Sequence, residues 1–121
     1  MRGTRGDSFY LESILKAIES LEEYSSVGHD VFLSDQMRQD AVICRLCVIG
    51  EAVKRLSEDI RSRYSEVPWK QMAALRDVLV HNYFGVDLEI LWGILERDLP
   101  SLKNQLQALP EYKSLTEENN I

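Results

Sequence analysis

The stretch from Ser34 to Arg63 constrains the fold most, because its apolar residues form two adjacent stripes at helical spacing. One stripe comprises Val42, Leu46, Ile49, Val53, Leu56 and Ile60, and the other comprises Met37, Ala41, Cys44, Val48 and Ala52. A helix that is apolar over so wide an arc is normally buried on two sides. In a chain of 121 residues, one side can pack against the chain's own helices, and the second suggests a partner subunit. We therefore expect one long helix, capped by Ser34, and a homodimer.

The same periodicity predicts three more helices, over residues 8–24, 68–85 and 88–109. Pro68 suits a helix start, and Gly85 is placed to end that helix in a left-handed conformation. Asp87 can cap the last helix, which Pro100 should kink or split. The predicted fold class is all-α, an up-and-down bundle of four long helices with short connections.

Length and a hydrophobic content of 45% suit a single domain, residues 1–121. We expect the polar ends, 1–7 and 110–121, to be flexible. The sequence has no run of eighteen apolar residues and no apolar secretory leader, so we expect a cytoplasmic protein that does not contact membrane. The net charge of −6 argues against nonspecific binding of nucleic acid, although a local basic site is compatible with it.

The cysteines and one histidine are interpreted as ordinary structural residues. Cys44 and Cys47 form a C-x-x-C pattern inside the apolar helix, where two buried small side chains are expected. His29 lies in the small, polar stretch 25–33, which predicts a loop with a solvated imidazole. Two scattered histidines and no cysteine–histidine ligand spacing give no case for a metal, and we expect no cofactor.

The third predicted helix ends in a cluster of chemically useful side chains, Arg76, Asp77, His81, Asn82 and Tyr83. Positions four apart lie about 40° apart on a helix and positions seven apart about 20°. Asp77 should therefore adjoin His81, and Arg76 should share a face with Tyr83. The histidine can move a proton, and the guanidinium can hold a phosphate. Asn82 adds a neutral hydrogen-bonding group.

A second interpretation of this cluster is a solvated helix end, with an Arg76–Asp77 ion pair and His81 on the surface. From spacing alone this interpretation is favoured, because the pattern R-x4-H is short. Arg38 and Arg45 share a stripe of the long helix. Arg45 either extends to the surface or lines the same cleft as Arg76, with Glu51 as its expected partner.

The pattern R-x4-H-x-Y, followed by FGVDLEILW, resembles the HepT-like toxins of the HEPN superfamily. The stretches from Met37 to Tyr64 and from Val67 to Asp77 are similar to the same family, so the resemblance covers residues 11–109. It implies a HEPN helical bundle, a homodimer and a metal-independent endoribonuclease. In that family's terms, His81 is the general acid or base, and Arg76 binds the scissile phosphate of the RNA substrate, with Arg38 and Arg45 as further candidate contacts.

The resemblance also implies a partner and a form of regulation. Such toxins are paired in a type VII-like toxin–antitoxin module with a small nucleotidyltransferase of the MNT class, which transfers AMP to the tyrosine of the motif, here Tyr83. Added phosphate close to His81 would repel RNA and block the cleft. The alternative function is a non-catalytic module that binds a nucleotide or docks the nucleotidyltransferase. For Tyr83 itself, the alternative is a ring packed on Phe84 or Trp92.

Overall fold

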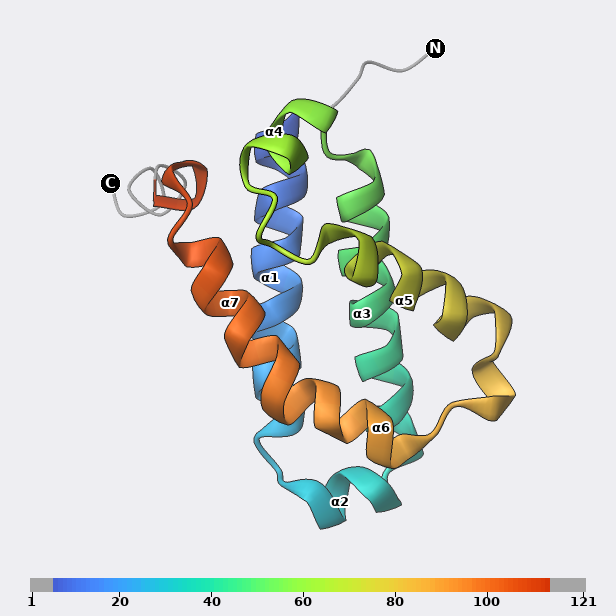
Figure 1. Ribbon diagram of the computed structural model, residues 1–121. Helices are drawn as coiled ribbons and strands as arrows, with labels where there is room; N and C mark the ends of the chain where they lie inside the picture. The colour runs from blue at the N-terminus through green and yellow to red at the C-terminus, as the bar shows by residue number, and fades with distance from the viewer. Residues whose placement is uncertain (1–5, 114–121) are drawn as a thin grey trace.

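The computed structural model describes residues 6–113, and these residues form helices and short connections without a strand (Figure 1). The elements in order are α1 (Asp7–Ser25), α2 (His29–Ser34), α3 (Gln36–Arg55), α4 (Glu58–Arg63), α5 (Trp69–His81), the 3-10 turn η1 (Tyr83–Gly85), α6 (Leu88–Gly93), the π-helical segment η2 (Ile94–Asp98) and α7 (Leu99–Gln107). The all-α class is confirmed. Of the four long helices expected, the first is present as α1, and the other three are each divided into shorter elements.

Helix α3 lies at the centre of the molecule and packs against both α1 and α5. Figure 1 shows α1 and α3 side by side, with α7 crossing α1 and α2 lying across the end of the pair. The first apolar stripe of α3 supplies the core between them, and Leu46, Ile49 and Val53 are all buried. The prediction of a buried stripe at this spacing is therefore confirmed.

The predicted long helix is interrupted, because α3 ends at Arg55 and α4 begins only at Glu58. Leu56 is extended, and the Ser57 hydroxyl caps α4 by accepting a hydrogen bond from the Ile60 amide at 3.2 Å. Both the Ser57 amide and its hydroxyl donate to the Asp7 carboxylate, at 2.8 and 2.6 Å. A side chain fifty residues earlier thus stabilises the break, which the helical periodicity does not reveal.

The expected loop at residues 25–33 is wrong in its second half, which forms α2. Gly28 has φ of +90°, a conformation that side chains disfavour, and it turns the chain from α1 into this helix. Phe32 is fully buried and holds α2 against the core. The side chain of His29 is 40% exposed and is also held in place, since its Nε2 lies 2.8 Å from Glu89 Oε1 and its ring contacts Trp92 edge to face.

Capping and helix ends differ from the predictions in three places. Asp35, not Ser34, caps α3, and its carboxylate accepts the Arg38 amide at 3.1 Å. Helix α5 ends at His81, four residues before the predicted end. Gly85 does not adopt a positive φ and lies inside η1.

The last helical segment starts and divides as the sequence predicts. Asp87 caps α6, and its carboxylate accepts the amides of Glu89 and Ile90. The helix changes to π-helical spacing in η2 and resumes as α7, which carries Pro100 in its first turn. Proline lacks the amide hydrogen that an α-helix needs at this point, so the interruption falls where that bond is missing.

Two described residues within the predicted flexible ends, Asp7 and Tyr112, make anchoring contacts. Tyr112 is only 2% exposed, and its hydroxyl donates to the Leu11 carbonyl at 2.7 Å. Asp7 holds Ser57 as described above. The remaining residues of the two predicted tails, 1–5 and 114–121, lie outside the described residues. None of the described helices is long and apolar enough to cross a membrane.

Candidate active site on helix α5

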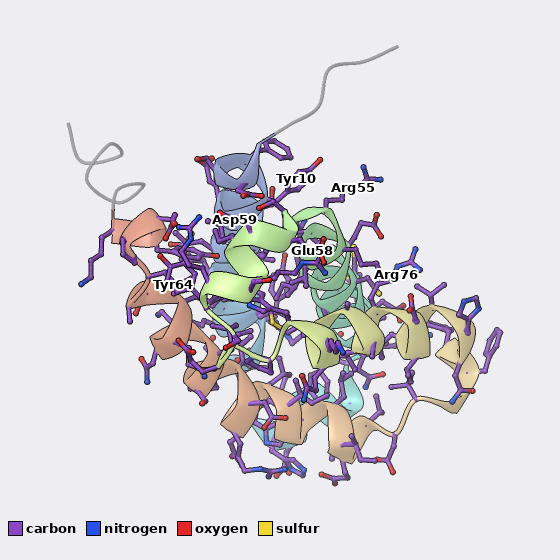
Figure 2. The ribbon with its side chains drawn as sticks, turned by 45° about the horizontal axis from the view of Figure 1, so that its top comes forward. Tyr10, Arg55, Glu58, Asp59, Tyr64 and Arg76 are labelled. Atoms are coloured by element: carbon purple, nitrogen blue, oxygen red, sulfur yellow. The ribbon has the colours of Figure 1, made fainter. Side chains whose placement is uncertain are left out.

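The guanidinium of Arg76 lies between two carboxylates. Its Nη1 donates to Asp77 Oδ1 at 3.2 Å, and its Nε lies 3.6 Å from Glu51 Oε1 on α3. The side chain is 32% exposed, so it is held in place and still open to solvent. Figure 2 shows Arg55 and Arg76 on the same side of the molecule, where α3 and α5 lie together.

Asp77 does not pair with His81 as predicted. Its Oδ1 is contacted by Lys54 Nζ of α3 as well as by Arg76. The Lys54 bond, followed by the Arg76 bond, holds the pKa of the Asp77 carboxyl below its usual range. Two cations outcompete an exposed imidazole for one carboxylate, because they carry full charge at neutral pH.

His81 is the last residue of α5 and is exposed. Among the described residues, its imidazole has no hydrogen-bond or ion-pair partner. An imidazole in this position is open to a substrate. Asn82 ends the helix, and its carbonyl accepts the Gly85 amide at 3.0 Å.

Tyr83 does not share a helix face with Arg76 as predicted, because α5 ends at His81, two residues before Tyr83. Its hydroxyl donates to Asp40 of α3, and this bond is the main reason that the pKa of Tyr83 is raised. The ring packs edge to face on Phe84 with centroids 5.4 Å apart, so the expected packing on that residue is confirmed. The residue is 40% exposed, and its hydroxyl is already bonded.

The two candidate arginines of α3 are not brought into the cluster by any contact. Arg38 donates to the Tyr24 carbonyl at 3.2 Å and pairs with Asp35, which ties the end of α1 to the start of α3. Arg45 is half-buried. Its expected partner Glu51 instead binds Arg55 and Arg76, at 3.0 and 3.6 Å.

Several apolar side chains on α3 and near the motif are exposed. Met37 of the second α3 stripe is 83% exposed, and Cys44 is exposed rather than buried as expected. Large apolar side chains near the motif are exposed as well, namely Val78, Val80, Tyr83 and Phe84. An apolar hollow of about 440 Å³ between α3, α5 and α7 contains none of the motif residues. The cluster therefore lies on an open face of the single chain.

Comparison with known families identifies the family of the chain. Residues 14–109 match the family described as "Ribonuclease HepT-like". The chain belongs to the HepT-like ribonuclease family. At family level, the names of its relatives support ribonuclease activity.

Relatives within the HepT-like family are similar over most of this chain. A "Probable ribonuclease HepT" of Thermococcus cleftensis is 43% identical over 87% of this chain and 96% of its own length. A "Putative RNase" of Caldanaerobacter subterraneus is 39% identical over 83% and 90%. A Methanocaldococcus jannaschii protein named "Gamma-glutamylcyclotransferase and putative RNase" is 43% identical over 84% of this chain, which spans only 46% of that relative. No solved structure matched significantly.

Three residues of α3 contact the candidate site, and the sequence alone did not indicate these contacts. Lys54 contacts Asp77, Glu51 contacts Arg76, and Asp40 accepts the Tyr83 hydroxyl. All three lie on α3, and each is a charged residue within an apolar helix. A charged residue within an apolar helix is a sequence signal for such contacts, although it does not identify the partner of each charge.

Proposed function

We propose that this HepT-like chain is a metal-independent endoribonuclease that acts as a homodimer. The observation that carries the proposal is the C-terminal part of α5, from Arg76 to His81, in a chain of this family. There, a guanidinium held by two carboxylates is followed five residues later by an exposed imidazole with no partner among the described residues. A fixed positive charge and one mobile proton are what cleavage of RNA by its own 2′-hydroxyl requires.

In the proposed reaction, the 2′-hydroxyl of the RNA attacks the adjacent phosphorus, and a His81 imidazole takes its proton. The bond from phosphorus to the 5′-oxygen breaks, and a second His81, protonated, supplies the proton to that leaving oxygen. Arg76 stabilises the negative charge that develops on the non-bridging oxygens. The products are a 2′,3′-cyclic phosphate and a free 5′-hydroxyl.

A homodimer supplies the second histidine. The exposed part of the second α3 stripe, Met37 and Cys44, supports an interface on this helix, whereas Ala52 of the same stripe is buried within the chain. Burial of such a stripe against its own copy would be favourable and would bring two copies of the motif toward one groove. Sedimentation at micromolar concentration tests this part, and a strict monomer contradicts it.

The proposed regulation is transfer of AMP to Tyr83 by an MNT-class nucleotidyltransferase antitoxin of a type VII-like module. The tyrosine oxygen would attack the α-phosphorus of ATP and release pyrophosphate. The added phosphate would lie two residues from His81 and repel the RNA backbone. The exposure of Tyr83, 40% for the residue, supports the proposal.

The decisive experiment is incubation of the purified protein with total RNA in the presence of a chelator. We expect cleavage by the wild type and none by His81→Ala or Arg76→Ala. The matched control is His29→Ala, which removes the other histidine outside the cluster. Intact RNA with the unmodified wild type would contradict the proposal.

A second candidate function is a non-catalytic module that binds a nucleotide or docks a nucleotidyltransferase. Two observations favour it: the net charge of −6 disfavours RNA, and Arg76 already has two carboxylate partners. Calorimetry would then show nucleotide binding without RNA cleavage. Growth arrest on expression, relieved by Arg76→Ala, would exclude this function.

A further inference from the structure

At Gly50, one turn of α3 lies so close to the start of the motif on α5 that a side chain at this position would not fit. A methyl group added at Gly50 would lie 2.3 Å from Arg76 Cβ and 2.9 Å from the Met72 carbonyl oxygen. These distances are far below van der Waals contact, so the two helices can approach here only because residue 50 lacks a side chain. The backbone of Arg76 is thereby fixed against α3.

The same turn carries two charged side chains that reach across to α5. Glu51 Oε1 lies 3.6 Å from Arg76 Nε, and its second oxygen, Oε2, is held by Arg55 Nε at 3.0 Å. Lys54 Nζ contacts Asp77 Oδ1, the oxygen that also accepts from Arg76. Each carboxylate is thus bound from both helices.

The balance of charge in this network decides what Arg76 can bind. Three cations, Lys54, Arg55 and Arg76, meet two carboxylates, Glu51 and Asp77, so the network keeps one net positive charge in a chain of net −6. Without Lys54, Asp77 would pair with Arg76 alone, and the network would be neutral. A neutral network attracts phosphate less than a positive one.

We propose that Glu51 and Lys54 are positioning residues for Arg76, an inference that rests on the proposed ribonuclease function. Glu51 fixes the direction of the guanidinium from the Nε side and leaves its outer edge open to phosphate. Lys54 shares the charge of Asp77, so Arg76 keeps enough positive charge to bind an RNA phosphate. The contact at Gly50 sets the helix separation at which both interactions form.

The two residues should respond differently in kinetics. In Glu51→Gln, the guanidinium loses its anchor while the site gains positive charge, so we expect kcat to fall about tenfold or more without a rise in KM for RNA. In Lys54→Met, the site loses one charge, so we expect KM to rise several-fold and the dependence of KM on salt to weaken. Lys54→Arg should restore most of the wild-type KM.

Lys103→Met is the matched control for Lys54→Met. Lys103 Nζ pairs with Glu22 at 2.7 Å between α7 and α1, and its side-chain exposure of 29% is close to the 35% of Lys54. Loss of an inter-helix ion pair as such should therefore affect both variants equally. Equal kinetics of Lys54→Met and Lys103→Met, or equal loss of kcat with unchanged KM in both test variants, would overturn the proposal.

A second measurement tests whether Glu51 positions Arg76, even if the wild type cleaves no RNA. Nitrogen-15 NMR of the arginine Nε–H groups reports how freely each guanidinium turns. We expect a restricted Arg76 signal in the wild type and faster rotation or solvent exchange in Glu51→Gln, with no change in Lys103→Met. A freely rotating Arg76 in the wild type would overturn the positioning role. Uncleaved RNA with a restricted Arg76 would overturn only the proposed activity.

Discussion

The hydroxyl of Tyr83 donates a hydrogen bond to the carboxylate of Asp40, a residue near the start of α3. This bond joins the turn that follows the motif to the central helix. It also raises the pKa of Tyr83, because Asp40 stabilises the protonated hydroxyl. Any group attached to the tyrosine oxygen would replace the donated hydrogen and break the bond.

Tyr83→Phe and Asp40→Asn should each loosen η1. Phenylalanine removes the donor, and asparagine replaces a charged acceptor with a weaker neutral one. We expect faster amide hydrogen exchange over residues 83–85 in both variants, and no further increase when they are combined, since they share one bond. Tyr24→Phe, at the end of α1, is the control and should leave η1 unchanged. Full additivity in the double variant would show that the bond does not hold this turn.

Gly50→Ala should destabilise the fold, whereas Gly93→Ala should not. At Gly50 the new methyl group meets the Arg76 Cβ and the Met72 backbone, so α5 must shift, at a cost of about 1–3 kcal/mol. At Gly93 it meets only the Arg97 guanidinium, a flexible end that can move aside. Alanine also favours a helix over glycine by about 0.5–1 kcal/mol. Urea unfolding measures both, and equal midpoints would contradict the close approach at Gly50.

The stability contributed by His29 should depend on pH. Hydrogen bonds from the imidazole to the carboxylates of Glu89 and Asp30 raise the pKa of His29 above its ordinary value of 6.5, so the folded state binds the proton more tightly than the unfolded state. This contribution is fully present below the ordinary pKa and is lost as pH rises through the higher folded pKa. We therefore expect wild type and His29→Gln to differ in melting temperature near about pH 5.5 and to converge toward about pH 8. A difference that grows with pH would contradict the sign.

Tyr112 should anchor the C-terminal part of the described chain. Tyr112→Phe keeps the buried ring and loses the bond to the Leu11 carbonyl, which should cost about 0.5–1.5 kcal/mol. Tyr112→Ala also leaves a cavity in the core and should cost about 3–5 kcal/mol. Denaturant unfolding of the two variants separates the ring from the hydroxyl. Equal stability of Tyr112→Ala and wild type would show that this segment does not contribute to the fold.

Local patterns predicted much of the fold. Apolar spacing predicted the helices around Leu11, Leu46 and Leu79, all of which are buried. The cap at Asp87 and the interruption at Pro100 followed from the chemistry of single residues. These features depend on neighbours three or four positions away in sequence, which is why they can be read without a structure.

The errors arose where distant residues decide the local conformation. The break after Arg55 depends on Asp7, and α2 depends on the burial of Phe32 and on the contact between His29 and Glu89. The expected Asp77–His81 pair was geometrically allowed on α5. It did not form because Lys54, on another helix, binds the same carboxylate.

The sequence by itself determined that this chain is helical, that α3 carries a second apolar stripe, and that Arg76 and His81 lie at the end of one helix. Hydrogen bonding and apolar periodicity within a segment are sufficient for such conclusions. Only the tertiary structure decided which charges meet, because an ion pair between helices depends on their separation and rotation. Gly50, Glu51 and Lys54 acquire their relation to Arg76 and Asp77 from the packing of α3 against α5.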